Sequence, residues 1–272
     1  MRLIRLAFPA IAASLIASFA FLPPAEAARC NPPGGFNAFI AEFKSEAARA
    51  GISRRTIDSA LNGLTPNATV LRLDRNQKHF RVSFEQFAAQ RVTSGRVNKA
   101  KSMLRQHANL FAGIERRFGV PRQIIVAIWA METDFGANTG NMSAVRSLAT
   151  LAHDCRRTEL FQGELMAALR IIDRGDMSAD QMRGAWAGEL GQTQFLASNY
   201  LRFAVDYDGN GRRDLIRSVP DVLASTANYL KSYGWRAGQP WGPGSANFSV
   251  IRQWNKSENY ARAIALFADR VS

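Results

Sequence analysis

The most apolar segment of the chain beyond residue 27 reads Ile124-Ile125-Val126-Ala127-Ile128-Trp129-Ala130-Met131-Glu132. Gly119-Val120-Pro121 precedes it, and proline suits the first turn of a helix. Gly136 and Gly140 follow it in a loop that could admit a polymer. The segment therefore predicts a buried helix from Arg122 to about Phe135 in the core of the protein.

Glu132 closes this apolar stretch and is the first charged residue after Arg122. On a helix, Ile125, Ile128 and Trp129 lie on the same face as Glu132. A carboxyl group in such a wall loses hydration, so its charged form is disfavoured and its pKa rises. These conditions suit a general acid at neutral pH. The alternative is a solvated carboxylate on an outer face or near the helix end.

Apolar residues recur at helical spacing through most of the chain, whereas alternating strand patterns are scarce. The pattern predicts further helices over residues 36–43, 53–61, 76–90, 96–118, 158–173, 197–204, 220–233 and 258–269. The sequence has no visible internal repeat and no linker rich in serine or proline. We therefore expect a mainly α protein, a helical globule with little strand. Residues 28–272 would form one unit with a helical N-terminal part.

The composition excludes a disordered chain. The protein has 272 residues, a hydrophobic content of 47% and a formal net charge of +13, which suit one large domain or two small ones. The basic excess indicates an anionic partner, such as nucleic acid, a membrane surface or an acidic extracellular polymer. The arginines are scattered and no recognition motif accompanies them, so nucleic acid is not expected.

Residues 1–27 have the features of a secretory signal peptide. A basic start precedes an apolar run over residues 6–22, Pro23-Pro24 breaks the run, and Ala25-Glu26-Ala27 offers a cleavage site. A membrane anchor is the alternative, although the run is marginal in length for spanning a bilayer. Cleavage would remove two arginines and one glutamate and leave a net charge of +12. Export would make genomic DNA an unlikely partner of this basic protein.

Cys30 and Cys155 are the two cysteines of the chain. In an exported protein they can form a disulfide, and the alternative is two unpaired thiols. Arg29 directly before Cys30 disfavours a lipid-attachment site, which needs a small residue there. Neither cysteine has the C-x-x-C spacing of a redox site, and the three histidines form no H-E-x-x-H zinc motif.

Five ordered segments of the chain resemble the lytic murein transglycosylase B family. They are Phe118-Gly119-Val120-Pro121 with Ala130-Met131-Glu132-Thr133-Asp134-Phe135-Gly136, Gly184-Ala185-Trp186-Ala187-Gly188-Glu189-Leu190-Gly191-Gln192-Thr193-Gln194-Phe195, Ala204-Val205-Asp206-Tyr207-Asp208-Gly209-Asn210-Gly211, Ala227-Asn228-Tyr229-Leu230 and Trp254-Asn255-Lys256-Ser257-Glu258-Asn259-Tyr260. The resemblance implies a lysozyme-like fold. It also implies cleavage of the β-1,4 bond between N-acetylmuramic acid (MurNAc) and N-acetylglucosamine (GlcNAc) in peptidoglycan.

The resemblance maps the single catalytic glutamate of this family onto Glu132. Glu132 would protonate the glycosidic oxygen and then take a proton from the muramoyl 6-hydroxyl, closing a 1,6-anhydro ring without water. The substrate N-acetyl group would stabilise the cationic intermediate and replace a second carboxylate. Asp134 would point away from Glu132 on a helix. The alternatives are a hydrolytic muramidase and an inactive wall-binding or scaffold protein.

Other polar residues match substrate-contacting positions of the family. Gln194 resembles a glutamine that contacts the sugar, since an amide offers both a donor and an acceptor, and Gln192 is a weaker candidate. Tyr229 matches a tyrosine near the catalytic glutamate that could orient it through its hydroxyl. Asn255 and Tyr260 resemble a C-terminal substrate-facing pair, with helix capping and packing as the alternative.

Two positions depart from the family pattern. Ala185 stands where we expect a serine that helps to hold the glutamate or the sugar. Glu189 replaces a small residue beside the sugar-binding loop, which leaves a hydrolytic variant open.

The segment Asp206-x-Asp208-x-Asn210-Gly211-x-x-Asp214 begins like an EF-hand calcium loop. Arg217 occupies position 12, where a bidentate glutamate should stand. The family resemblance implies a longer loop closed by Asp221, with the backbone carbonyl of Arg212 as a further ligand. The prediction is a structural calcium ion, with a plain Asx-turn as the alternative. The reaction itself would need no cofactor.

The partner that the resemblance implies is the glycan strand of peptidoglycan, whose carboxylates would attract the basic surface. Complexes of wall synthesis or secretion are further candidates. The protein is expected to be a periplasmic monomer, with membrane association left open.

Overall fold

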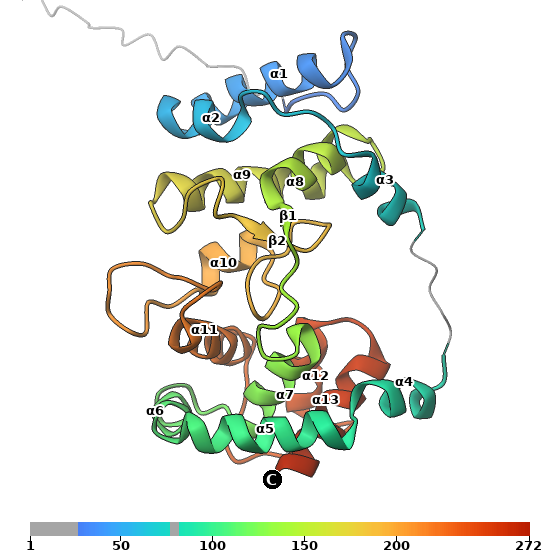
Figure 1. The fold of residues 1–272 in the computed structure, drawn as a ribbon, viewed down its shortest axis with the longest axis vertical. Coiled ribbons are helices and arrows are strands. Elements are labelled where there is room, and N and C mark those ends of the chain that lie inside the picture. The colour runs from blue at the N-terminus through green and yellow to red at the C-terminus, as the bar shows by residue number, and fades with distance from the viewer. Residues whose placement is uncertain (1–26, 77–81) are drawn as a thin grey trace, which may run out of the picture.

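The computed structural model describes residues 27–76 and 82–272. The described residues form thirteen helices and two short strands, so the prediction of a mainly α fold is confirmed (Figure 1). The elements are α1 (Gly35–Arg49), α2 (Arg54–Leu61), α3 (Ala68–Arg75), α4 (Phe84–Arg91), α5 (Ser94–Gln106), α6 (Ala108–Phe118), α7 (Arg122–Thr133), β1 (Met142–Ser143), α8 (Ala144–His153), α9 (Thr158–Asp173), β2 (Arg183–Gly184), α10 (Ala197–Phe203), α11 (Val219–Ser232), α12 (Ala246–Trp254) and α13 (Glu258–Val271).

One part of the molecule is built on the pair α8 and α9, which pack along each other (Figure 1). Helices α1 and α2 cover this pair, and α3 packs against α8. Phe39 and Phe43 on α1 are fully buried and supply the apolar face that α1 needs for this packing. Ser53 caps α2 by accepting a hydrogen bond from the backbone N–H of Thr56.

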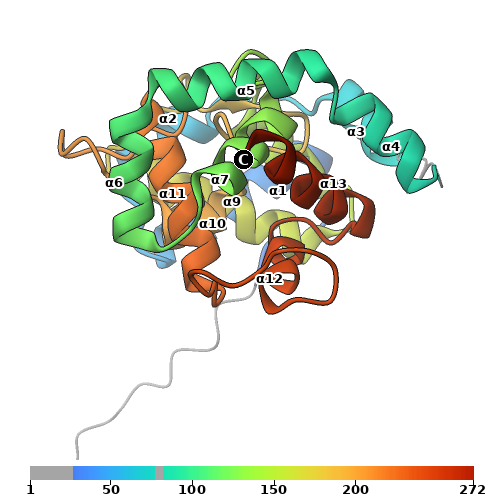
Figure 2. The same ribbon diagram turned by 90° about the horizontal axis from the view of Figure 1, so that it is seen from below.

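The other part surrounds α7, the helix predicted from the apolar segment. Helices α5, α6, α11 and α13 all pack against α7 (Figure 2). Ile124 to Ile128 are completely buried, which explains why this segment is apolar on every side. Helix α4 projects from this part and packs on α13.

The two parts meet at α10 and at the small sheet. Helix α10 packs against both α9 and α11. Strands β1 and β2 pair antiparallel, with Met142 opposite Gly184. A Cβ atom on Gly184 would lie 1.8 Å from the carbonyl oxygen of Glu189, so only glycine fits there. This close approach folds the loop that follows β2 back against the strand.

Several predicted helix boundaries were wrong. The helix expected over 76–90 is replaced by α3, which ends at Arg75, and by α4, which begins at Phe84; residues 77–81 lie outside the described part. The helix expected over 96–118 breaks at His107, whose φ of −110° ends α5 and starts α6. Helices α8 and α12 were not predicted, although the serine N-caps at 143 and 245 are signals for both.

Cys30 and Cys155 form a disulfide that joins the first described residues to the loop between α8 and α9. Their Cα atoms are 5.1 Å apart. The signal peptide predicted over 1–27 lies outside the described residues except for Ala27. None of the helices in the described part combines the length and the apolar character needed to cross a bilayer.

Candidate active site

Glu132 lies in the last turn of α7, and its side chain is half-buried. The predicted wall is present, because Ile125, Ile128 and Trp129 are all buried. Thr133, the last residue of α7, fixes the turn beyond it by accepting a hydrogen bond from the backbone N–H of Gly136 at 2.9 Å. The carboxyl group is therefore carried on a rigid, buried helix at the point where the chain turns into a loop.

Two side chains from distant parts of the sequence donate to the same oxygen of Glu132. The hydroxyl of Tyr260 is 2.6 Å from Glu132 Oε1, and the indole Nε1 of Trp254 is 2.9 Å from it. Oε2 has no hydrogen-bond partner within residues 27–76 and 82–272. A proton on the neutral acid therefore belongs on Oε2, because Oε1 already accepts two hydrogen bonds.

The environment of Glu132 raises its pKa above the ordinary 4.5. Burial is the largest cause, and the nearby negative charge of Glu189 acts in the same direction. The hydrogen bonds from Tyr260 and Trp254 favour the charged form and oppose the rise, as does the more distant Arg91. Burial and the neighbouring carboxylate raise the pKa of Tyr260 well above 10.0, so its hydroxyl stays protonated and can donate.

Tyr260 and Trp254 are held in place by their own helices. Tyr260 is in the first turn of α13, where the Ser257 hydroxyl accepts a hydrogen bond from its backbone N–H. Trp254 is the last residue of α12. Its ring makes edge contacts with Phe195, at 5.2 Å between centroids, and with Tyr229, at 4.8 Å. The indole N–H is thus aimed by an aromatic cluster.

The role expected for Tyr229 needs a correction. Its hydroxyl donates to the backbone carbonyl of Gln253 at 2.7 Å, and not to Glu132. Tyr229 therefore supports Trp254 through its ring and through the end of α12. The hydroxyl that reaches the glutamate belongs to Tyr260, which was expected to face substrate.

Asn255 follows Trp254, and its side-chain oxygen accepts a hydrogen bond from the backbone N–H of Ser257 at 3.0 Å. This contact ties down the turn between α12 and α13, as the capping alternative requires. Tyr260 is buried and points to Glu132, so the pair is not presented to substrate as predicted.

Gln194 lines a small pocket together with Phe195, Leu196, Asn199, Tyr229 and Trp254. Its side-chain nitrogen donates to the backbone carbonyls of Thr139, at 3.1 Å, and Gly191, at 2.9 Å. No partner of its Oε1 is present in the described part of the chain, so this oxygen can accept from a ligand. Gln194 has a φ of 56°, an uncommon value for a residue with a side chain.

Gln192 has a different role from the one predicted. Its Oε1 accepts from the indole of Trp129 at 2.9 Å, and its Nε2 donates to the carbonyl of Ile216 at 3.0 Å. Its backbone carbonyl accepts from Thr133 at 2.5 Å. Gln192 is buried and joins the loop after β2 to α7, so it is not a candidate sugar ligand.

Two further carboxylates lie near the site. Asp134 forms ion pairs with Arg96 and Lys99, at 3.5 and 3.3 Å, and turns away from Glu132. Burial raises the pKa of Glu189, and its Oε2 is buried without a hydrogen-bond partner among the described residues. Ala185, where a serine was expected, takes part in the turn through its backbone N–H, which donates to the Glu189 carbonyl at 3.0 Å.

The structure brings together three of the predicted calcium ligands. Carboxylate oxygens of Asp206, Asp208 and Asp221 lie within 4.8 Å of one another. Asn210 Oδ1 accepts from the backbone N–H of Arg212 at 2.9 Å. The side chain of Asp214, at the ninth position of the predicted loop, bonds to backbone N–H groups beyond it.

Asp221 is completely buried in this cluster. It accepts from the backbone N–H groups of Tyr207 at 2.7 Å, Asp208 at 3.3 Å and Asp214 at 2.9 Å. Burial raises its pKa, against the opposing effect of these bonds.

The sequence did not identify Trp254 as a functional residue. It stands directly before Asn255 in the last matched segment, and a tryptophan N–H is a donor that needs a partner when buried. That signal was available, but the identity of the partner depended on how α12 and α13 pack on α7.

Residues 35–244 match the model of the family described as "Transglycosylase SLT domain". The chain is 38% identical over 122 residues to Membrane-bound lytic murein transglycosylase B of Escherichia coli (strain K12). This alignment covers 44% of the chain and 34% of that relative, so the chain matches about a third of the relative's length.

The structure is similar to that of SltB3 from Pseudomonas aeruginosa, solved in complex with NAG-anhNAM-pentapeptide. The TM-score is 0.82 at 33% identity, covering 87% of this chain and 79% of that chain. The Escherichia coli lytic transglycosylase Slt35, solved in complex with calcium, shares the fold with a TM-score of 0.76 at 24% identity, covering 85% and 92% of the two chains. The family match spans more than half of the sequence, and this protein belongs to the Transglycosylase SLT domain family.

Proposed function

We propose that this protein is a lytic transglycosylase that cleaves the β-1,4 bond between MurNAc and GlcNAc in peptidoglycan. The observation that carries the proposal is Glu132, whose Oε1 is held by Tyr260 and Trp254 while Oε2 stays available. The SltB3 structure with a NAG-anhNAM-pentapeptide supports it, because that ligand carries the anhydro sugar that such a reaction forms.

In the first step, neutral Glu132 donates the proton on Oε2 to the glycosidic oxygen. The raised pKa favours the protonated form that a general acid needs. The bond from C1 of MurNAc to that oxygen breaks, and the GlcNAc part leaves as an alcohol. The N-acetyl group of MurNAc stabilises the positive charge that forms at C1.

In the second step, the Glu132 carboxylate accepts the proton of the MurNAc 6-hydroxyl as its oxygen attacks C1. The 1,6-anhydro ring closes, Glu132 is again neutral, and no water is consumed. Tyr260 and Trp254 stabilise the carboxylate between the two steps, because hydrogen bonds to a charged acceptor are stronger than those to a neutral one. Gln194 Oε1 accepts from an amide or hydroxyl of the sugar.

Digestion of purified sacculi followed by mass spectrometry of the muropeptides tests the proposal. The expected products carry 1,6-anhydro ends and are lighter by one water than products of hydrolysis, and Glu132→Gln should release neither. Reducing-end MurNAc would instead favour a hydrolytic muramidase, for which the half-buried Glu189 is the candidate second carboxylate. Binding to sacculi without turnover in the parent protein would favour an inactive wall-binding protein.

A structural calcium ion at Asp206, Asp208 and Asp221 is a second part of this proposal. Three carboxylates within 4.8 Å form a hard-oxygen donor set of the kind that calcium prefers. The ion would neutralise their mutual repulsion and fix the loop, and it takes no part in the glycan chemistry. A melting temperature that rises with calcium in the parent, and not in Asp208→Asn, would support this site.

The substrate also sets the proposed location. We infer that the protein acts in the periplasm as a monomer on glycan strands, after removal of residues 1–27. The relative from Escherichia coli is named as membrane-bound, so fractionation of cells expressing the full chain is the direct measurement.

A further inference from the structure

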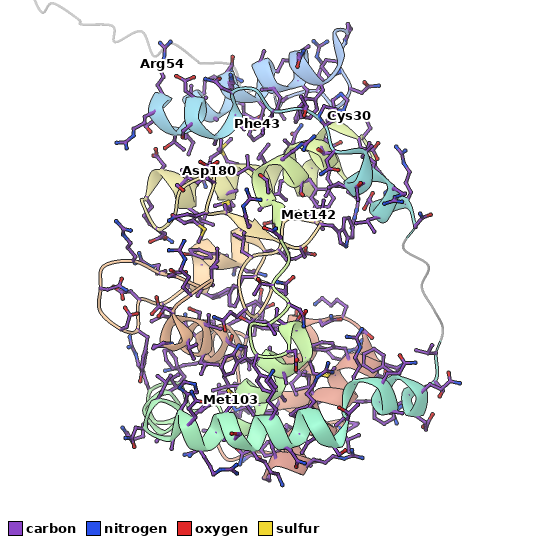
Figure 3. All side chains as sticks on the ribbon, viewed as in Figure 1. Cys30, Phe43, Arg54, Met103, Met142 and Asp180 are labelled. Atoms are coloured by element: carbon purple, nitrogen blue, oxygen red, sulfur yellow. A yellow bond between two sulfur atoms is a disulfide. The ribbon has the colours of Figure 1, made fainter. Side chains whose placement is uncertain are left out.

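The first described residues are fixed to the folded protein by several contacts. Ala27 is exposed, whereas Ala28 is buried with 6% of its surface accessible. The backbone N–H of Ala28 donates to Glu46 Oε2 on α1 at 2.8 Å, and the buried Gln162 on α9 donates to the Ala28 carbonyl at 2.5 Å. Two residues later, Cys30 is in the disulfide with Cys155, close to the end of α8 (Figure 3).

These contacts are compatible with a chain that starts at Ala28. Hydrolysis of the bond between Ala27 and Ala28 would add one water, leaving a carboxylate on Ala27 and an ammonium on Ala28. The ammonium would stand where the N–H now meets Glu46, so a hydrogen bond to a carboxylate would become an ion pair with it. The small side chain of Ala28 is already buried in the core.

We propose that the ammonium of Ala28, which the proposed removal of residues 1–27 would create, docks on the Glu46 carboxylate. The inference rests on the proposed export of the chain and is independent of its catalytic activity. The disulfide uses the thiol of Cys30, so the same geometry leaves no thiol there to carry a lipid.

Glu42, a second carboxylate on α1, provides a matched control residue for Glu46. Glu42 lies one turn before Glu46 on α1, and it pairs with Arg29 at 2.7 Å through Oε1 and with the Arg29 backbone N–H at 3.0 Å. Arg49 is three residues after Glu46 on the same helix. Glu42 therefore shares the helix and the charge of Glu46 but not its contact with Ala28.

The test begins with the full chain, expressed with its own leader in a Gram-negative host. Intact-mass and N-terminal analysis should find a chain that starts at Ala28 and contains the disulfide. A chain that starts elsewhere, or one acylated on Cys30, would overturn the proposal.

The second measurement is the rate at which cyanate carbamylates the α-amine, followed by mass spectrometry of the N-terminal peptide across pH. Docking on Glu46 should raise the pKa of the amine above the ordinary value of about 8, and each unit slows labelling about tenfold at pH 7. Glu46→Gln should restore the ordinary rate, whereas Glu42→Gln should leave labelling slow. Equal rates in the parent and Glu46→Gln would refute docking. If Glu46→Gln fails to fold, one extra glycine before Ala28 provides the same comparison, because it moves the amine off Glu46.

Discussion

Two acidic regions of the molecule, the end of α7 and the loop from Asp206 to Asp221, hold their carboxylates in different ways. Glu132 has one oxygen bound by two side-chain donors, while the other has no partner in the described residues. Asp221 uses both oxygens to accept backbone N–H groups of its own loop. Burial raises the pKa of both groups, so burial alone does not mark a catalytic acid. The difference lies in whether an oxygen remains available for a reaction.

The largest effect is expected from Glu132→Gln. The amide cannot donate the required proton, so the rate of sacculus digestion should fall by about 10³-fold. Asp134→Asn is the matched control two residues away, because Asp134 is turned towards Arg96 and Lys99. If Glu132→Gln kept the parental activity, Glu132 would not be the catalytic acid.

The same variant should differ from the parent in stability as a function of pH. Because the pKa of Glu132 is raised in the folded protein, the unfolded chain loses this proton first as the pH rises above 4.5. Glu132 therefore stabilises the fold less at neutral pH than in acid. Urea unfolding should show Glu132→Gln gaining stability relative to the parent between pH 4.5 and 7.

Asp221→Ala should lower the free energy of unfolding, whereas Glu132→Gln should lower the rate of sacculus digestion. It leaves the backbone N–H groups of Tyr207, Asp208 and Asp214 without their acceptor, which should cost about 3 kcal/mol of unfolding free energy. Asp58→Asn, which removes an exposed ion pair with Arg54, should cost much less. If urea unfolding puts both variants at the parental value, the loop carboxylates are not structural.

Tyr260→Phe should give a smaller loss of rate, about tenfold, because it removes one of two donors to Glu132. A donor to the carboxylate lowers the pKa of that group, so its removal should move the alkaline limb of the pH–rate profile upward. Tyr229→Phe is the control, since its hydroxyl bonds to Gln253. Equal pH profiles for the two variants would argue against the positioning role of Tyr260.

The smallest effect is expected from Glu189→Gln. The negative charge of Glu189 raises the pKa of Glu132, so its removal should move the alkaline limb of the pH–rate profile downward. The direction is opposite to that of Tyr260→Phe, which makes the pair of variants informative together. A fall in kcat without any shift of the profile would instead point to a direct role of Glu189.

The part of the site that the sequence could predict is the part carried by one helix. The apolar run before Glu132 indicated both a buried helix and a desolvated carboxyl, and both are present. The donors could not be predicted in the same way. Tyr229 and Tyr260 are both helical tyrosines in matched segments, and which hydroxyl reaches Glu132 depends on the packing of α11 and α13 on α7.

The roles of Gln192 and Gln194 could not be distinguished from the sequence either. Its amide is chemically suited to a sugar, as is that of Gln194, two residues later. The structure buries Gln192 against Trp129 and leaves an oxygen of Gln194 available. The backbone around these amides is fixed by close approaches that leave no room for a Cβ atom at Gly184, beside the Glu189 carbonyl, or at Gly191, beside the Leu215 carbonyl. Such long-range contacts cannot be read from the sequence.

The two donors to Glu132 come from the C-terminal end of the chain. Trp254 and Tyr260 follow Glu132 by 122 and 128 positions, and both lie beyond residue 244, where the match to the family model ends. A chain made from its N-terminus holds Glu132 long before the two groups that bind it. The site is therefore incomplete until α13 has packed on α7, and proteolysis before residue 254 would return the molecule to that state.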